Sequence, residues 1–251
     1  MNNKKVIVNI ISLYKPGVRL DNFLNELDIL IDRKFDVSCV LQNYPEDILR
    51  VLRTKRLDVL TCEAKNPSKA ENEFLKKYYD SDYDYFILLH DDILLNFVPK
   101  TKEKDFINYF LKEVKKLKED EVVITLQENS FVFRNLKNPT IKETFHFWEC
   151  AFIMRNIYKE FKVKVFFNEN IFAVEGTAFS VDLFRKGFKV MSHEGNSTFK
   201  QMIEKSTYGN HEQRKETLRL NRIKIYELNK DIFNLTKNFQ LRRKQNALKE
   251  I

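Results

Sequence analysis

The sequence predicts an α/β fold with a mostly parallel, Rossmann-like central sheet flanked by helices. The run Tyr85–Leu89 is continuously apolar, which suits a strand buried on both faces of a parallel sheet. Before it, short apolar runs alternate with helical patterns from Val6 onward. With 251 residues, of which 43% are hydrophobic and 32% charged, the chain is long enough for one sizeable globular domain.

The elements of the first half follow in order from hydrophobic spacing. Val6–Leu13 is a β-branched run of the kind that forms a first buried strand. After it we expect a helix at Arg19–Ile31, a strand at Val37–Leu41, a helix at Glu46–Arg53 and a strand at Leu57–Cys62. Because strands joined by right-handed helical crossovers run parallel, this order predicts a parallel sheet.

The later elements give less regular signals. Ser68 is interpreted as the N-cap of a helix, with Glu71 completing a capping box, and the N-terminus of such a helix is a natural phosphate site. The further elements expected are a helix at Lys102–Lys118, a strand at Val122–Leu126, a helical stretch at Cys150–Phe161, a strand at Val163–Phe167 and a helix closed by Gly187.

Composition excludes several classes of protein. Only five glycines occur, and neither a GxGxxG nor a GxxxxGK[ST] pattern is present, which counts against Rossmann dehydrogenases and P-loop NTPases. Cys39, Cys62 and Cys150 are widely spaced and predict free thiols in a reducing compartment, without a disulfide framework or zinc spacing. No apolar run reaches the roughly 20 residues of a membrane-spanning helix, and no signal-peptide pattern opens the chain, so we expect a cytoplasmic protein.

Positive charge is concentrated at the end of the chain. From Arg214 to Ile251 there are eleven Lys and Arg against four acids, a net of +7 out of the +8 of the whole chain. Residues 207–251 therefore form a basic, helix-prone C-terminal extension, a candidate for contact with nucleic acid or with the anionic inner membrane surface. The alternative is that its apolar stripe covers the core; this stripe comprises Leu218, Ile225, Leu228, Ile232, Phe233 and Leu235.

Two adjacent carboxylates follow the most apolar strand. The run Tyr85–Leu89 ends in His90-Asp91-Asp92. Carboxylates at the end of a buried strand are costly to desolvate unless a cation or a ligand shares the space. In open α/β sheets the carboxyl ends of the strands are where ligands bind. The alternative is an ordinary polar transition from strand to loop.

This segment resembles the metal-binding Asp-x-Asp strand end of nucleotide-sugar glycosyltransferases of the GT-A fold, especially the family 2 type, with His90 in place of the first acid. The resemblance implies that Asp92 binds a divalent metal directly and that Asp91 contacts the donor. It also implies that His90 and His193 assist at the metal, His193 within a stretch similar to the family's His-x-x-Gly-x-Ser element. Oxygen ligands suit Mg²⁺, and imidazole would favour Mn²⁺.

The loops that precede this strand carry further similarity to the family. The segment that contains Ser12 and Tyr14 loosely matches the Thr-Tyr-Asn-Arg loop after the first strand. Gln42-Asn43 stands where the family has Asp-Asn or Asp-Asp, and residues 68–72 are similar to its Gly-x-Ala-Arg-Asn helix, with Glu71 for the usual Arg. The resemblance implies that the nucleotide-diphosphate sugar contacts Ser12, Tyr14, Gln42, Asn43, Lys69 and Asn72.

A last block carries the expected chemistry. Residues 172–190 are similar to the family's Gly-Glu-Asp-Thr-Asp element and the helix that follows it. Glu175 matches the Glu, whereas Gly176 replaces the Asp that usually acts. The resemblance implies that Glu175 is the general base that deprotonates the acceptor hydroxyl, with inversion at the sugar carbon.

The resemblance spans roughly residues 5 to 200, and we expect a glycosyltransferase domain at 1–206. It implies metal-dependent transfer of a sugar from a nucleotide-diphosphate donor, with UDP as the expected nucleotide, to a glycan, a glycolipid or another hydroxyl. Two alternatives stay open: a phage-type DNA glycosyltransferase that acts on a hydroxymethylated base, and a non-catalytic nucleic-acid-binding module. A nucleotidyltransferase is a third alternative, disfavoured by the missing glycine-rich first loop.

Overall fold

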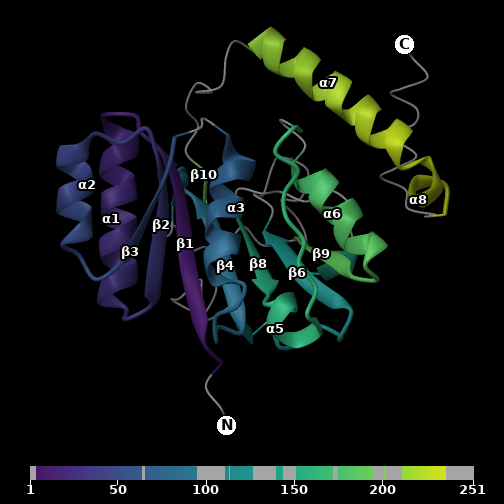
Figure 1. The fold of residues 1–251 in the computed structure, drawn as a ribbon, viewed down its shortest axis with the longest axis horizontal. Helices are drawn as coiled ribbons and strands as arrows, with labels where there is room; N and C mark the ends of the chain where they lie inside the picture. The colour runs from purple at the N-terminus through teal and green to yellow at the C-terminus, as the bar shows by residue number, and fades with distance from the viewer. Residues whose placement is uncertain are drawn as a thin grey trace.

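The fold is organised around one eight-stranded mixed sheet (Figure 1). The computed structural model describes residues 4–63, 66–94, 111–112, 114–126, 140–143, 151–171, 175–194, 200–201 and 211–235. The strand order in the sheet is β3-β2-β1-β4-β8-β6-β9-β7. Its strands are β1 (Val6–Leu13), β2 (Asp36–Gln42), β3 (Asp58–Cys62), β4 (Tyr85–His90), β6 (Glu121–Leu126), β7 (Thr140–Glu143), β8 (Ala151–Arg155) and β9 (Lys189–Glu194).

The remaining elements are helices and one small ribbon. The helices are α1 (Val18–Asp32), α2 (Glu46–Arg53), α3 (Pro67–Tyr78), α5 (Ile157–Phe161), α6 (Glu175–Arg185), α7 (His211–Leu228) and α8 (Lys230–Leu235). Strands β5 (Ile93–Leu94) and β10 (Lys200–Gln201) pair antiparallel in a separate two-stranded ribbon.

Most strands of the sheet run in one direction, as predicted. β1 pairs in parallel with both β2 and β4, and β2 pairs in parallel with β3. β8 is reversed because it pairs antiparallel with β4 and β6, and β7 is reversed against β9. The predicted α/β class with a mostly parallel central sheet is therefore confirmed, and the carboxyl ends of β1, β2, β4, β6 and β9 lie at the same edge.

Helices cover the sheet on both faces and give it two cores. Side chains of α1 and α2, including Phe23, Leu27 and Leu52, pack with one face of β1, β2 and β4. Side chains of α3, α5 and α6, including Phe74 and Phe179, pack on the other face. Strand β4 contributes alternate residues to each core, which is why its sequence is apolar without interruption.

The first-half elements are confirmed to within a residue or two at their ends. The two thiols predicted to be free within the described chain, Cys39 and Cys62, are free and buried. The predicted capping box is wrong: Asn66 is the N-cap of α3 and accepts from the Lys69 N–H at 3.3 Å, while Ser68 is buried inside the helix. Pro67 occupies the first helical position, where its missing N–H costs nothing.

Two predictions in the second half are wrong. Cys150–Phe161 is not a helix, because Ala151–Arg155 forms β8 and only Ile157–Phe161 is helical. Val163–Phe167 is not a strand. Its backbone bonds side chains of α3 instead: the Phe167 N–H donates to Asn72 Oδ1 at 2.8 Å, and the Val165 carbonyl accepts from Tyr79 Oη. These side chains replace a neighbouring strand as hydrogen-bond partners.

Other predicted segments are described in part. At the end of the predicted helix Lys102–Lys118, Val114 is buried and Leu111 and Leu117 pack on the α1 side of the sheet. The rest of that helix lies outside the described residues, as does Cys150. None of the described helices combines the length and apolar character that a membrane crossing needs.

The described part of the basic extension packs on the domain. Ile225 of α7 and Ile232 of α8 are buried in a cluster with Ile171 and with Ala178 and Val181 of α6. Leu218 packs beside them. Leu228 is 65% exposed, so its assignment to the packing stripe is wrong. The side chains of Phe233 and Leu235 lie outside the described residues, and the domain boundary at 206 stays a prediction.

The end of α6 is closed by a glycine in a left-handed conformation. Gly187 has φ +84°, its N–H donates to the Phe184 carbonyl at 2.9 Å, and the Phe188 N–H donates to the Leu183 carbonyl at 3.0 Å. This pair of bonds is a Schellman motif with Gly187 at the C′ position. The predicted role of Gly187 is confirmed.

Substitution of Gly187 should therefore cost stability through its backbone alone. An added Cβ would meet nothing within 4 Å, so Gly187→Ala is expected to lower the free energy of unfolding by about 1 kcal/mol. Gly187→Asn should cost less, because Asn tolerates the left-handed region. Urea denaturation compares the three proteins, and equal stability of Gly187→Ala and wild type would contradict the assignment.

Candidate functional site

The candidate site lies where β1, β2 and β4 end side by side. The register places Leu13 beside Gln42 and Ile11 beside His90. Residues that follow these positions therefore meet at the carboxyl edge of the sheet, above the N-termini of α1 and α3 (Figure 1). The structure brings together Ser12, Tyr14, Gln42, His90 and Asp91 at this edge, and their shared role in binding a donor stays a prediction.

Asp91 is held from three sides and is only 3% exposed. Ser12 Oγ donates to its Oδ2 at 2.5 Å, and Arg19 Nε donates to its Oδ1 at 2.8 Å. Arg19 Nη2 forms a second contact with Oδ1, and Asn22 Nδ2 donates to the Asp91 carbonyl at 3.2 Å. Burial raises the pKa of Asp91, while Arg19 and Ser12 act in the opposite direction. Both carboxylate oxygens are thus engaged within the protein.

Two tyrosines lie next to this carboxylate. Tyr44 Oη shares a 2.5 Å hydrogen bond with Ser12 Oγ. The rings of Tyr14 and Tyr44 meet edge to face, with centroids 5.3 Å apart and planes at 67°. Both rings are half-buried. They form an aromatic wall at the ends of β1 and β2, of the kind that can stack on a planar base.

Gln42, the last residue of β2, and Asn43, which follows it, differ in how far their side chains are exposed. Gln42 is 1% exposed, and its Nε2 donates to the Asn66 carbonyl at 3.1 Å. The main-chain carbonyl of Gln42 accepts a hydrogen bond from the Tyr14 N–H at 2.9 Å. Asn43 is exposed and has φ +56°, which Asn tolerates better than most residues. Gln42 therefore braces the edge, whereas the Asn43 side chain faces solvent.

His90 lies against a buried acid that the sequence reading assigned only to a helix cap. His90 Nε2 is 3.8 Å from Oε1 of Glu71, whose side chain is fully buried in α3. Burial lowers the pKa of His90 to about 4, an effect that Asp92 opposes and Arg19 reinforces. Helical spacing could have revealed Glu71, because it precedes the buried Phe74, Leu75 and Tyr78 by three, four and seven positions.

Asp92 follows His90 and Asp91 in the tight turn between β4 and β5 and is half-buried. His193 lies in β9, and β8 and β6 separate β9 from β4. Three steps of about 4.8 Å put these strands roughly 14 Å apart. The structure therefore places His90 and Asp92 at the end of β4 and the His193 backbone three strands away. The His193 side chain lies outside the described residues, and its role at the metal stays a prediction. Within the described ranges, no three or more His, Cys, Asp or Glu side chains are grouped closely enough to hold a metal ion.

The N-terminal half of α3 holds the chain that leads to α6. Asn72 is 2% exposed, and its Nδ2 donates to the Phe167 carbonyl and to Glu169 Oε1, both at 2.9 Å. Asn66 Nδ2 donates to the Glu169 carbonyl at 3.0 Å. Lys69 is exposed on the same turn of the helix. Asn72 thus has a bracing role in the fold, and its contact with a donor stays a prediction.

Glu175 is the first residue of α6 and is 2% exposed. The helix is anchored on the segment that Asn72 holds, because the Phe179 and Phe167 rings stack at 4.1 Å with planes 4° apart. The general-base role of Glu175 stays a prediction.

Two residues of this edge were missed from the sequence, Arg19 and Tyr44. Arg19 contacts Asp91 across 72 positions of the chain, so no local pattern links them. Tyr44 lies two residues after Gln42, in the loop that the sequence analysis treated only as the end of a strand.

Two hollows in the described surface, of about 270 and 440 Å³, lie at the opposite edge of the sheet, near Lys4 and Lys118.

Solved structures share this fold. The chain is similar to glucosyl-3-phosphoglycerate synthase from Mycobacterium tuberculosis, solved with Mn²⁺, UDP and phosphoglyceric acid; the TM-score is 0.52, the identity 7%, and the match covers 80% of this chain and 72% of that one. It is also similar to a mycobacterial protein, with a TM-score of 0.57, 8% identity and coverage of 89% and 74%. These matches establish a GT-A-like α/β fold and nothing finer.

A putative nucleotide-diphospho-sugar transferase from Desulfovibrio desulfuricans G20 matches over 98% of this chain and 97% of its own, at 11% identity. Its TM-score of 0.47 is too low to support the assignment. At the level of sequence, no family model and no curated protein matches the chain. Membership of glycosyltransferase family 2 is therefore not established.

Loss of Arg19 should expose the cost of the buried charge on Asp91. Arg19→Met is expected to lower the free energy of unfolding by about 3–5 kcal/mol, because it leaves a carboxylate that is 3% exposed without its cation. Adding Asp91→Asn should restore much of the loss. Chemical denaturation measures both. As a control, Arg53→Met removes the exposed pair with Glu46 and should cost less than about 1 kcal/mol; a similar cost at both sites would contradict this account.

Proposed function

We propose that this protein is a metal-dependent glycosyltransferase that moves a sugar from a nucleoside-diphosphate donor, with UDP as the preferred nucleotide, to an acceptor hydroxyl. One observation carries the proposal. A fixed carboxylate, Asp91, and a half-buried one, Asp92, end the central strand of a GT-A-like sheet, beside an aromatic wall and the N-terminus of α3. Ligands bind at this edge in open α/β sheets.

The donor nucleoside is assigned to the ends of β1 and β2. Tyr14 and Tyr44 offer ring surface to the base, and Asn43 offers an exposed amide for hydrogen bonds. Gln42 and Ser12 support this wall from below through their bonds to Asn66 and Tyr44. Lys69, exposed at the start of α3, and the positive end of that helix's dipole suit the diphosphate.

Asp92 is assigned as the protein ligand of the divalent metal, with Asp91 in a positioning role. Both oxygens of Asp91 are engaged with Arg19 and Ser12, which favours a role in fixing the turn that presents Asp92. Mg²⁺ and Mn²⁺ bound with a nucleotide need only one or two carboxylates, because phosphates and water complete the shell, so the residues present fit such an ion. When bound, the metal would neutralise the charge that develops on the diphosphate.

Glu71 and His90 are the two departures from the family's pattern in α3 and at the end of β4, and they lie 3.8 Å apart in the fold. Because burial lowers the pKa of His90 to about 4, its imidazole is neutral near pH 7 and forms no charge pair with Glu71 there.

Glu175 is assigned as the general base. Its carboxylate takes the proton of the acceptor hydroxyl while the hydroxyl oxygen forms a bond to the anomeric carbon. The bond from that carbon to the diphosphate oxygen breaks, and the leaving nucleoside diphosphate keeps the electron pair. Attack opposite to the leaving group inverts the anomeric carbon. The anchoring of α6 through Phe167 and Phe179 would hold the base in position.

The proposal also names an acceptor class and a cellular location. The acceptor is assigned as the hydroxyl of a glycan or glycolipid, in a cytoplasmic setting. A donor screen with Mn²⁺, followed by hydrolysis or thermal shift, tests the donor class first, and the solved neighbour with Mn²⁺ and UDP makes UDP-sugars the first set to try. Transfer to hydroxymethylated DNA, or tight DNA binding without donor hydrolysis, would instead favour the DNA-directed alternatives.

Removal of the proposed metal ligand should abolish metal-dependent donor binding. Asp92→Ala is expected to lower affinity for a nucleotide sugar in Mn²⁺ to the level measured in EDTA, because the remaining ligands come from the donor and water. Isothermal titration measures both. Asp47→Ala changes an exposed acid on α2 and serves as the control, expected to bind as wild type. Unchanged donor affinity in Asp92→Ala would remove Asp92 from the site.

Neutralisation of the proposed base should affect turnover rather than binding. Glu175→Gln is expected to lower kcat by about 10²–10⁴-fold with little change in donor affinity, since the amide keeps the shape and cannot take a proton. Steady-state kinetics and donor titration together measure this. The control is Glu46→Gln, an exposed acid of α2. Equal losses in binding and rate would indicate a structural role for Glu175.

A further inference from the structure

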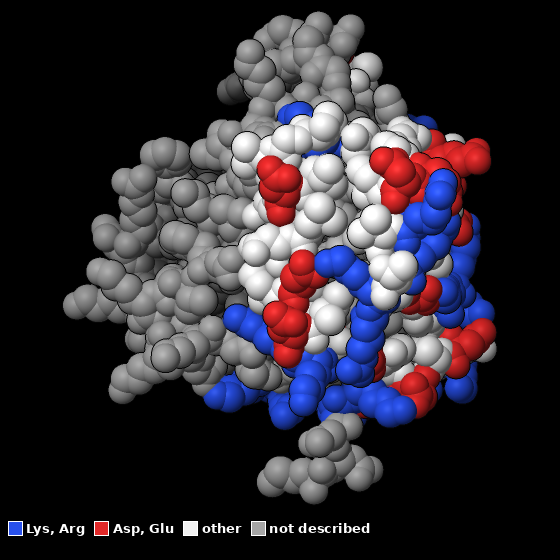
Figure 2. Space-filling view, turned by 90° about the vertical axis from the view of Figure 1, so that its left-hand side faces the viewer, with Lys and Arg blue, Asp and Glu red and all other residues white. Residues whose placement is uncertain are grey.

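Basic side chains gather at the amino edge of the sheet, opposite to the candidate site. The segments that meet there are the starts of the parallel strands, the end of α3 and the chain around α5. They are residues 4–5, 33–36, 53–58, 76–84, 115–121, 155–164 and 185–189, which we call the basic rim. The rim carries nineteen Lys and Arg against nine Asp and Glu, a net of +10. Figure 2 shows basic side chains along the lower border of the α1–α2 face, at this edge.

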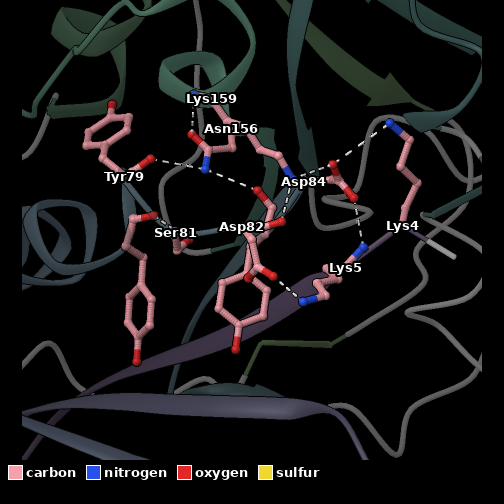
Figure 3. A network of polar contacts seen from close by, with 10 residues as sticks. Lys4, Lys5, Tyr79, Ser81, Asp82, Asp84, Asn156 and Lys159 are labelled. Carbon is pink, nitrogen blue, oxygen red and sulfur yellow. Dashed lines mark hydrogen bonds and ion pairs between the residues drawn. The ribbon is translucent and has the colours of Figure 1, made fainter. Parts of the chain in front are cut away.

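Direct contacts join the rim segments to one another. The Lys5 N–H at the start of β1 donates to Asp84 Oδ2 at 2.9 Å, and Lys159 Nζ from α5 donates to Asp84 Oδ1 at 3.0 Å (Figure 3). On the far side, Arg155 Nη1 donates to the Lys118 carbonyl at 3.0 Å, and the Lys189 N–H donates to the Asp120 carbonyl at 2.7 Å. The rim is therefore one continuous surface.

The acids of the rim are largely engaged inside it. Asp58, Asp80, Asp82, Asp84, Asp120 and Glu160 each form an ion pair with a Lys or Arg of the rim. Four further rim cations pair with acids just outside the rim, which neutralises part of the excess: Arg53 with Glu46, Lys55 with Asp28, Lys76 with Glu73 and Arg185 with Asp231. Sixteen of the nineteen basic side chains are exposed, and the rim remains basic. A surface with this sign and extent attracts polyanions.

The amino-acid composition of the rim indicates which kind of polyanion it suits, nucleic acid or an anionic lipid surface. Fourteen of the nineteen cations are Lys and five are Arg. The Lys ammonium is a compact point charge on a flexible stem, whereas recognition of nucleic acid favours the planar, bidentate guanidinium of Arg. Exposed aromatic rings for base stacking are also missing from the described rim, because Tyr78 and Tyr79 are buried and Tyr83, Tyr158 and Phe161 are half-buried. Both features favour a lipid surface.

We propose that the basic rim docks the protein on an anionic lipid bilayer, with the candidate site on the side that faces away from the membrane. Of the two acceptors proposed above, a glycan in solution fits this orientation and a glycolipid of the same membrane does not. Each Lys or Arg near an anionic surface strengthens binding by about fivefold, and the effect fades within a Debye length of about 8 Å at physiological salt. The inference does not rest on the proposed chemistry, because it uses only the charge and arrangement of the opposite edge.

Charge-reversal variants of the full-length protein test the proposal in vesicle co-sedimentation. The rim variant carries Arg56→Glu, Lys118→Glu and Lys186→Glu, three exposed cations from three different segments of the rim. The matched control changes the same net charge on the C-terminal extension, at Arg222, Lys224 and Lys230, all exposed and all replaced by Glu. Vesicles are pure phosphatidylcholine, or phosphatidylcholine with phosphatidylglycerol.

The wild-type protein should sediment with the anionic vesicles and not with the neutral ones, and less so as salt rises. The rim variant should bind at least on the order of 100-fold more weakly, while the extension variant keeps most of the binding. Circular dichroism monitors folding. Should the rim variant fail to fold, the neutral set Arg56→Gln, Lys118→Gln and Lys186→Gln replaces it, with an expected loss of at least tenfold.

Three results would overturn the proposal. The first is the absence of binding of the wild-type protein to anionic vesicles at low salt. The second is a loss confined to the extension variant, which would assign membrane contact to α7 and α8. The third is release of the protein from vesicles by duplex or single-stranded DNA at equal charge concentration, which would make nucleic acid the partner. None of these results bears on donor binding, so the proposed function is tested separately.

Discussion

The buried carboxylate of Asp91 is the constraint on which the site edge depends. A charge that is 3% exposed at a strand end must be compensated within the protein. Arg19 from the first turn of α1 and Ser12 from the end of β1 supply the compensation. Because both partners precede Asp91 by more than seventy positions, one side chain fixes the start of α1 against the end of β4. The loop between β1 and α1, which contains Tyr14, is thereby held before any ligand arrives.

A second brace connects this edge to α6. Asn66 and Asn72 of α3 bond the backbone around Phe167 and Glu169, and Gln42 bonds the Asn66 carbonyl from the end of β2. The donor half and the segment that leads to Glu175 therefore share one set of amide hydrogen bonds. Asn72 matches a ligand-binding position of the family's motif, yet its side chain also forms hydrogen bonds that stabilise the fold. A buried amide needs such partners for its donors and its acceptor.

Much of the fold could be predicted from the sequence because its signals are local. β1, β2 and β4 are apolar runs buried on both faces, β3 is a half-buried edge strand, and their spacing with helices leaves one plausible topology. The prediction of a helix over Ala151–Arg155 was wrong, because a run this short and apolar shows no periodicity that distinguishes a strand from a helix. The prediction of a strand at 163–167 was wrong for a different reason. The backbone of this segment bonds the side chains of Asn72 and Tyr79, and a hydrophobic pattern along the segment cannot reveal such partners.

The candidate site was predictable in its position but not in its partners. The Asp91-Asp92 pair was visible because acids follow an apolar run. Arg19 was not, since its contact with Asp91 closes only in the folded chain. Glu71 was visible in principle, through its helical spacing with Phe74 and Leu75, and was hidden by a capping-box pattern that Asn66 and Pro67 override. Non-local ion pairs and competing local motifs account for what was missed.

Basic and acidic side chains lie in different regions of the fold, and the net charge of successive stretches of the sequence does not reveal this separation. By sequence position, the last 38 residues carry +7 of the +8. In space, the rim carries +10, while the other described residues before α7 include seven Lys and Arg against sixteen Asp and Glu. At the site edge, Asp91 pairs with Arg19, and the fully buried Glu71 lies 3.8 Å from His90. A divalent metal beside Asp92, as proposed, would place a cation between this edge and an anionic diphosphate. The opposite edge is basic, so its charge suits a different kind of partner from that of the site.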